Sequence, residues 1–186
     1  MGRSGVMEGK SPLTAVVAVL PEELWPPVQE IRRRHDRQLH RWMPHVTLLY
    51  PFLPSDRLTA ARPRLRQVAA ESRAFEVELA HFELFRHERA ATLWLRPEPN
   101  DPFEALRTAL ESAFPGMDDT RRFAHGFTPH LSVGQAPLDE AEGLRAALQA
   151  GWRPLRWRVD AVALIRRGPP PRDVFRIDAL APLSSP

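Results

Sequence analysis

Apolar and polar positions fall into blocks that predict alternating strands and helices along the first half of the chain. Residues 13–20 form a near-continuous apolar run that ends at Pro21, which is typical of a buried strand. Farther on, Phe75, Val77 and Leu79 alternate with polar residues, as in a half-buried strand. The predicted order is strand, helix, strand, helix, strand, over residues 13–20, 24–41, 46–50, a helix that begins at 55 or 56, and 75–85.

The same order begins again in the second half. Asn100-Asp101-Pro102 opens a helix with proline in its first turn, and residues 115–127 are expected to form a loop. The expected elements are a strand, a helix, a strand, a helix and two final strands, over residues 91–95, 100–114, 130–133, 138–150, 155–165 and 174–180. The sequence therefore predicts an α+β fold of two pseudo-symmetric β-α-β-α-β lobes around a central cleft.

Length and composition fit a single domain. The chain has 186 residues, of which 43% are hydrophobic and 26% charged, as in ordinary globular proteins. Residues 1–11 contain three glycines and no apolar secretory segment, so we expect a disordered leader there. One bilobal domain at 12–181 and a short tail at 182–186 follow. No apolar run reaches about 18 residues, so no membrane span is predicted.

Cysteine usage and charge narrow the chemistry. The chain has no cysteine, which excludes disulfides, thiolate metal sites and a cysteine nucleophile, and is compatible with a cytoplasmic location. Its formal net charge is +3, and Lys10 is the single lysine among 26 basic residues. This modest positive charge is compatible with a phosphate-bearing partner without identifying one. We expect a cytoplasmic monomer with no membrane partner.

One five-residue pattern occurs twice. Pro44-His45-Val46-Thr47-Leu48 and Pro129-His130-Leu131-Ser132-Val133 each read proline, histidine, apolar, hydroxyl, apolar, and the two histidines are 85 residues apart. Chance supplies the full pattern about 0.01 times in a chain of this composition, so its duplication is the strongest signal in the sequence.

A strand gives this pattern a chemical meaning. Side chains alternate between faces along a strand, so each histidine shares a face with the hydroxyl two positions later, while the apolar residues face the core. Two such strands side by side would supply two imidazoles for acid–base chemistry and two hydroxyls that donate to an anionic group.

The doubled motif resembles the signature of the 2H phosphoesterase superfamily, which includes the 2′-5′ RNA ligase-like proteins and RNA 2′,3′-cyclic phosphodiesterases. The family motif, HxTx or HxSx, occurs in two copies, matched here by His45/Thr47 and His130/Ser132, and the strand–helix repeat covers about residues 13–180. The resemblance implies a bilobal α+β fold, metal-free catalysis without a cofactor, and a phosphodiester bound between the motifs. By the same analogy, His45 is favoured as the acid and His130 as the base.

The leading hypothesis is a metal-independent phosphodiesterase that hydrolyses the 2′,3′-cyclic phosphate of a nucleotide or an RNA end. One histidine would activate water while the other protonates the departing ribose oxygen, because imidazole titrates near neutral pH. A non-catalytic nucleotide- or RNA-binding module and a 2′-5′ RNA ligase are the alternatives. The expected partner is accordingly a nucleotide or an RNA with a cyclic phosphate or a 2′-5′ linkage.

Residues that flank the motifs are candidates for substrate binding. Tyr50, Phe52 and Phe127 could stack a nucleobase, or they could pack in the core or between the lobes. Arg121 and Arg122 could bind phosphate, or they could be solvated loop charges.

The charge that would balance a phosphate stays unassigned. In cyclic phosphodiesterases of this superfamily an arginine often follows the second motif, whereas this chain has Gly134-Gln135. The run Arg32-Arg33-Arg34 is interpreted as the solvated face of the first helix, with a nucleic-acid contact as the alternative. No group of histidines and carboxylates has the spacing of a metal site, so no metal is expected.

Overall fold

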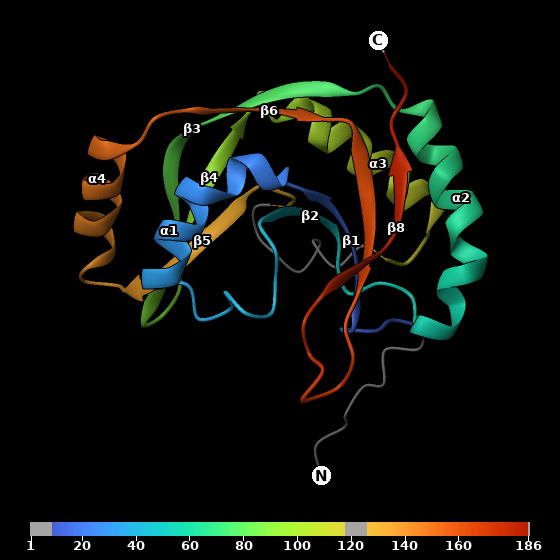
Figure 1. The fold of residues 1–186 in the computed structure, drawn as a ribbon, viewed down its shortest axis with the longest axis horizontal. Helices are drawn as coiled ribbons and strands as arrows, with labels where there is room; N and C mark the ends of the chain where they lie inside the picture. Colours follow the sequence, from blue (N-terminus) through green and yellow to red (C-terminus); the bar gives the residue numbers. More distant parts are fainter. Residues whose placement is uncertain (1–8, 118–125, 186) are drawn as a thin grey trace.

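The fold consists of two four-stranded sheets with helices packed around them (Figure 1). The structure is a computed structural model and describes residues 9–117 and 126–185. Its elements are, in chain order, β1 (Thr14–Val19), a 3₁₀ turn (Glu22–Leu24), α1 (Trp25–His35), β2 (His45–Leu49), a second 3₁₀ turn (Ser55–Arg57), α2 (Leu58–Glu71), β3 (Phe75–Arg86), β4 (Ala90–Glu98), α3 (Asp101–Ala113), β5 (Leu131–Pro137), α4 (Ala141–Gly151), β6 (Leu155–Val159), β7 (Ala161–Arg166) and β8 (Arg176–Pro182).

All strand pairs within the two sheets are antiparallel. The first sheet has the order β2-β1-β7-β8, and the second has the order β5-β4-β3-β6. Each motif strand therefore lies at the edge of its sheet, and β2 and β5 contact each other where the sheets meet. This arrangement confirms the predicted α+β fold with two pseudo-symmetric halves.

The sheets exchange strands between the two halves of the sequence. The strand β3 ends the first half, yet it pairs with β4 and β6 in the second sheet, while β7 and β8 return beside β1. The turn between β3 and β4 spans only residues 87–89, so these neighbours form a hairpin. The single strand expected over 155–165 likewise divides at Asp160 into β6 and β7, one in each sheet. Neither sheet is therefore a contiguous half of the chain.

The first two helices begin or end away from their expected positions. The helix expected to reach Arg41 ends at His35, because Asp36 adopts an extended conformation and its Oδ1 accepts the backbone N–H of Gln38 at 2.8 Å. This local turn takes the place of further helical hydrogen bonds. The helix expected from 55 or 56 begins as a 3₁₀ turn, and α2 then continues from Leu58.

The helices tie the sheets together around one large apolar core. Helix α1 packs against β5 and helix α3 packs against β2, so each contacts the motif strand of the other half. Val46 and Leu48 from the first motif, and Leu131 and Val133 from the second, are at most 2% exposed in this core. The apolar motif positions therefore face inward, as their alternation predicts.

A second, smaller apolar cluster covers the other face of the first sheet. Its buried members are Ala15, Val17, Ala163, Ile165 and Phe175, and Val19, Trp42, Met43 and Tyr50 pack against it. In the β1–β2 register, Val19 is paired with His45 and Val17 with Thr47. Paired residues in an antiparallel sheet share a face, so the first motif's polar side chains lie on the face that carries this cluster.

Residues near both ends of the described chain form backbone hydrogen bonds with the rest of the fold. Of the expected leader, residues 1–8 lie outside the described part, whereas Ser11 exchanges backbone hydrogen bonds with Phe52. In the expected tail, the backbone N–H of Ser184 donates to the carbonyl of Ser72 at 2.8 Å. No helix in the described residues is long and apolar enough to cross a membrane.

Candidate active site

His45 is the first residue of β2 and is held by two hydrogen bonds. Its Nδ1–H donates to the carbonyl of Met43 at 2.6 Å, which leaves Nε2 as the acceptor of the neutral ring. The Thr47 hydroxyl lies 3.1 Å from that Nε2. The histidine and the hydroxyl therefore share one face of the strand, as the motif predicts, and Nε2 is the nitrogen available for proton transfer.

His130 repeats this arrangement directly before β5. Its Nδ1–H donates to the carbonyl of Thr128 at 2.7 Å, again two residues upstream. Ser132 lies in the second position of β5 and is half-buried. Both motif histidines thus have the same tautomer, fixed by the same kind of backbone contact at Nδ1, so Nε2 is in each ring the nitrogen that can act as an acid or a base.

The structure brings the two motifs together. β2 and β5 are in contact, and the charge of His130 lowers the pKa of His45. Two imidazoles close enough for the charge of one to lower the pKa of the other can act on one small anionic group. This proximity is the condition that the paired-histidine hypothesis requires.

Burial lowers the pKa of both histidines. The pKa of His45 falls to about 4, chiefly through desolvation, and the positive charge of Arg32 lowers it further. The Met43 carbonyl and Asp36 act in the opposite direction. For His130, burial also lowers the pKa, against the hydrogen bond to Thr128. Both rings are therefore neutral at pH 7 in the free protein.

Aromatic side chains surround both rings, and the sequence reasoning missed most of them. Trp42 stacks on His45 with ring centroids 4.9 Å apart, and Phe175 also stacks on Trp42, with centroids 3.9 Å apart. His130 is perpendicular to Phe85 at 4.9 Å and lies near Trp94. One sequence signal was available for Trp42, because it lies three residues before the first motif histidine, as Phe127 does before the second.

Of the three aromatic candidates, Phe52 belongs to the core. It is fully buried and meets the edge of Phe114 at 5.1 Å between centroids. Tyr50 is half-buried, packs edge-on against Trp42, and its hydroxyl donates to the Pro12 carbonyl at 3.3 Å. The core alternative is therefore correct for Phe52, whereas Tyr50 lies beside the aromatic group on His45.

Phe127 lies in the described part of the chain, whereas the two arginines proposed to bind phosphate do not. Phe127 is half-buried, with the guanidinium of Arg107 over its ring at 4.6 Å. Arg121 and Arg122 lie outside the described residues.

The interpretation of the first-helix arginines was wrong for Arg32, which is only 2% exposed, because it falls on the buried stripe that Val28 begins. Arg33 and Arg34 are exposed, as expected.

Gly134-Gln135 joins β5 to the end of α1. A Cβ on Gly134 would lie 2.6 Å from the His35 Cβ and 2.9 Å from its carbonyl oxygen, so only glycine allows this close approach. The Gln135 amide donates to Asp36 at 3.3 Å and accepts the backbone N–H of Arg37 at 3.0 Å. At the position where the resemblance led us to expect an arginine, this chain therefore has a packing contact between helix and strand.

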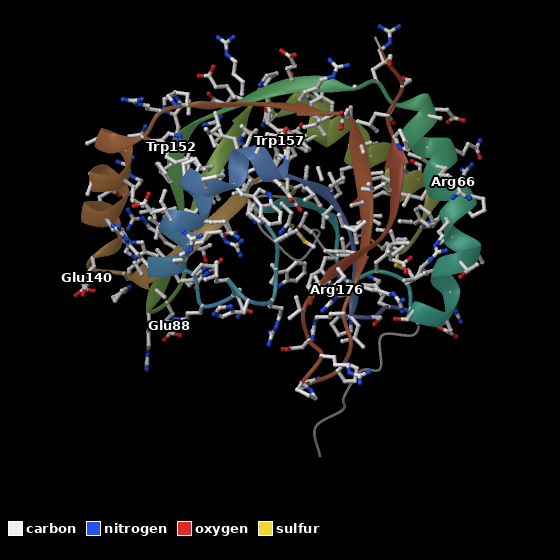
Figure 2. The ribbon with its side chains drawn as sticks, viewed as in Figure 1. Arg66, Glu88, Glu140, Trp152, Trp157 and Arg176 are labelled. Atoms are coloured by element: carbon white, nitrogen blue, oxygen red, sulfur yellow. The ribbon has the colours of Figure 1, made fainter. Side chains whose placement is uncertain are left out.

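An apolar pocket of about 540 Å³ is lined by two residues that neighbour His45. Val19, the register partner of His45, and Met43, which accepts its Nδ1–H, both line this pocket. Trp157, labelled in Figure 2, lines it from β6. The acidic residues Glu22, Glu23 and Asp160 also line it. The volume lies in the range of small-molecule sites. In the part of the chain that the structure describes, no three histidine or carboxylate side chains gather as a metal site.

Known proteins share this sequence pattern and fold. The model of the 2′-5′ RNA ligase superfamily matches residues 20–170. The chain is 28% identical over 122 residues to a Geobacillus kaustophilus (strain HTA426) protein that is named provisionally as a phosphoesterase, a match that covers 64% of this chain and 67% of that protein. TT0787 of Thermus thermophilus has the same fold, with a TM-score of 0.59, 20% identity, and coverage of 92% of this chain and 98% of that one.

A second solved structure with this fold is that of E. coli LigT complexed with phosphate. Its TM-score is 0.59 at 17% identity, over 94% of this chain and 99% of that one. At such identities the two structural likenesses establish the fold alone, whereas the family model covers most of the chain. The chain therefore belongs to the 2′-5′ RNA ligase superfamily, the 2H phosphoesterases, as its doubled motif predicted.

Proposed function

We propose that this protein is a metal-independent phosphodiesterase that opens the 2′,3′-cyclic phosphate of a nucleotide or an RNA end. The observation that carries the proposal is the pair of motif histidines brought together by the contact of β2 and β5, each with Nδ1 bonded to a backbone carbonyl and with Nε2 as the nitrogen for proton transfer. LigT has been solved with phosphate and with 3′-AMP, which supports a nucleotide-sized ligand for this fold.

The reaction divides between the two rings. His130 Nε2 removes a proton from water, whose oxygen attacks phosphorus, and the bond from phosphorus to one ribose oxygen breaks. His45 Nε2–H gives its proton to that departing oxygen. The Thr47 and Ser132 hydroxyls donate to the non-bridging oxygens as negative charge grows there. His130 takes one proton and His45 gives one, so the cyclic phosphate and water are the only reactants.

The aromatic environment supports His45 as the acid. The Trp42 ring stacks on His45 with an angle of 18° between planes, and the face of an indole stabilises a cation such as imidazolium. Phe85 stands at 90° to His130. The anionic phosphate raises the pKa of both histidines, because a nearby negative charge favours the imidazolium form. His45 thus takes up its proton when substrate binds.

A metal-free substrate screen tests the proposal. We expect hydrolysis of at least one of the four 2′,3′-cyclic nucleotides or of a cyclic-phosphate RNA end, at an unchanged rate in EDTA. Tight nucleotide binding with the ligand recovered unchanged would contradict catalysis and favour a binding module. Joining of cleaved RNA halves through a 2′-5′ linkage, without hydrolysis, would favour a ligase.

The lowered pKa values predict an acidic optimum for kcat/KM, below about pH 6.5. Catalysis needs one protonated ring, and the protonated fraction of His45 grows as the pH falls from 7 toward its pKa of about 4. Activity falls again once the base is protonated too. Because bound phosphate raises the pKa of the acid, the optimum of kcat should lie at higher pH than that of kcat/KM. Steady-state profiles from pH 4 to 9 check this order, and a kcat/KM optimum above pH 7 would contradict it.

A further inference from the structure

Two buried arginines occupy equivalent places in the two halves of the fold. Arg32 on α1 is 2% exposed and Arg107 on α3 is 7% exposed, and each forms an ion pair with a carboxylate one helical turn later, Asp36 and Glu111. A buried charge is costly unless it is paired and hydrogen-bonded, so its presence twice in equivalent helices calls for a common role.

Arg32 links the approach to the first motif with the strand of the second. Its Nη2 donates to the carbonyl of Trp42 at 2.8 Å, and its Nε donates to Asp36 at 2.8 Å. The other oxygen of Asp36 accepts the Gln135 amide of β5 at 3.3 Å. The ring of Trp42 stacks on His45. One continuous set of contacts therefore runs from the first motif histidine to β5.

Arg107 makes the reciprocal link. Its Nε donates at 3.2 Å to the carbonyl of Leu48, which follows Thr47 in β2. Its guanidinium lies over the ring of Phe127, which precedes His130 by three residues. Trp42 precedes His45 by the same number. Each arginine thus contacts the aromatic residue before one motif and connects it with the strand of the other.

We infer that Arg32 and Arg107 are positioning residues that hold the two motif histidines in register by linking β2 and β5 through their buried guanidinium groups. The inference rests on the proposed function. β2 and β5 are edge strands of separate sheets and do not pair with each other in either, so side-chain contacts have to fix their relative position. A displacement of about 1 Å at reacting groups can cost on the order of 10²-fold in rate.

Arg32→Lys tests the link without removing its charge. Lysine keeps the cation but cannot direct three fixed donors to Asp36, Gln29 and the Trp42 carbonyl at once. We expect kcat to fall about 10²-fold with a change in KM of less than about threefold, while the His45 pKa stays near its wild-type value. Arg32→Met should in addition raise the His45 pKa, because Arg32 lowers it. NMR titration of the imidazole signals measures the His45 pKa in both variants.

Matched variants separate positioning from general damage. Arg34→Met is the control on the same helix, because Arg34 is 70% exposed and pairs only with Glu30 among the described residues, and it should leave kcat and both pKa values unchanged. Arg107→Lys should lower kcat as Arg32→Lys does. Since both arginines fix the same relative position of the motif histidines, kcat of the double variant should fall by less than the product of the two single decreases.

A second variant and a binding measurement also test the positioning role. If Arg32→Lys does not fold, Gln135→Met removes the same link at a half-buried position and should lower kcat by a smaller factor. Inorganic phosphate gives a readout without turnover: His45 and His130 signals should shift with one common Kd in the wild type and with separate values in Arg32→Lys. An inactive wild-type protein would overturn the proposed function alone. Lysine variants within twofold of wild-type kcat, or with a common phosphate Kd, would overturn the positioning role.

Discussion

Alanine at His45 or at His130 is expected to lower kcat for the best 2′,3′-cyclic nucleotide by about 10²–10⁴-fold. Each ring has its Nδ1–H bonded to a backbone carbonyl, at 2.6 Å and 2.7 Å, so Nε2 is already aimed before substrate arrives. Removing one ring leaves either the attacking water without a base or the departing oxygen without an acid. The same substitutions should change KM little, because the hydroxyls still meet the phosphate.

Initial rates in EDTA measure this effect, with circular dichroism as a check on folding. His81→Ala is the matched control: this histidine lies on β3, its side chain is 59% exposed, and its loss should leave kcat unchanged. The His45→Ala/His130→Ala protein should be about as slow as the slower single variant, because groups that act as a unit are not additive. Retention of a tenth or more of wild-type kcat in either single variant would refute the paired mechanism.

Phe52→Ala should lower the free energy of unfolding by about 3–5 kcal/mol. The Phe52 ring is fully buried, packs edge-on against Phe114, and its backbone pairs with Ser11. Truncation removes its buried surface and leaves a cavity that the surrounding strands cannot fill. KM for a cyclic nucleotide should stay within about twofold at a temperature where the variant is folded.

Urea unfolding of the variant and the wild type measures the difference, and Phe52→Leu is the control with a smaller volume loss, expected near 1 kcal/mol. The opposite result has a clear meaning. If Phe52→Ala unfolded like the wild type but bound nucleotides at least tenfold more weakly, the ring would be a base-stacking platform instead of a core residue.

The buried arginines show how a local pattern can mislead. Three consecutive arginines look like a solvated helix face, but Val28, Ile31 and Arg32 lie on one stripe at helical spacing. Arg107 falls in the same way between Phe103, Leu106 and Leu110. An arginine on an apolar stripe, with a carboxylate four residues later, was therefore a readable signal. Its partners were not readable, because the Trp42 carbonyl and Gln135 come from other elements.

The sequence by itself determined the motif strands and the family. The order proline, histidine, apolar, hydroxyl, apolar sets which side chains share a face, since alternation along a strand is a local property. It therefore predicted that Val46 and Leu131 would be buried and that the histidines would face away from the core, and the duplication identified the superfamily.

Only the tertiary structure decided which strands pair, what the flanking residues do, and how the motifs are held together. The exchange of β3 and β7 between sheets depends on contacts between residues far apart in the chain, which no local periodicity encodes. Gln135 illustrates the same limit, since in the sequence it is a departure from the family pattern. In the folded protein it is a hydrogen-bond partner of Asp36, because α1 packs on β5.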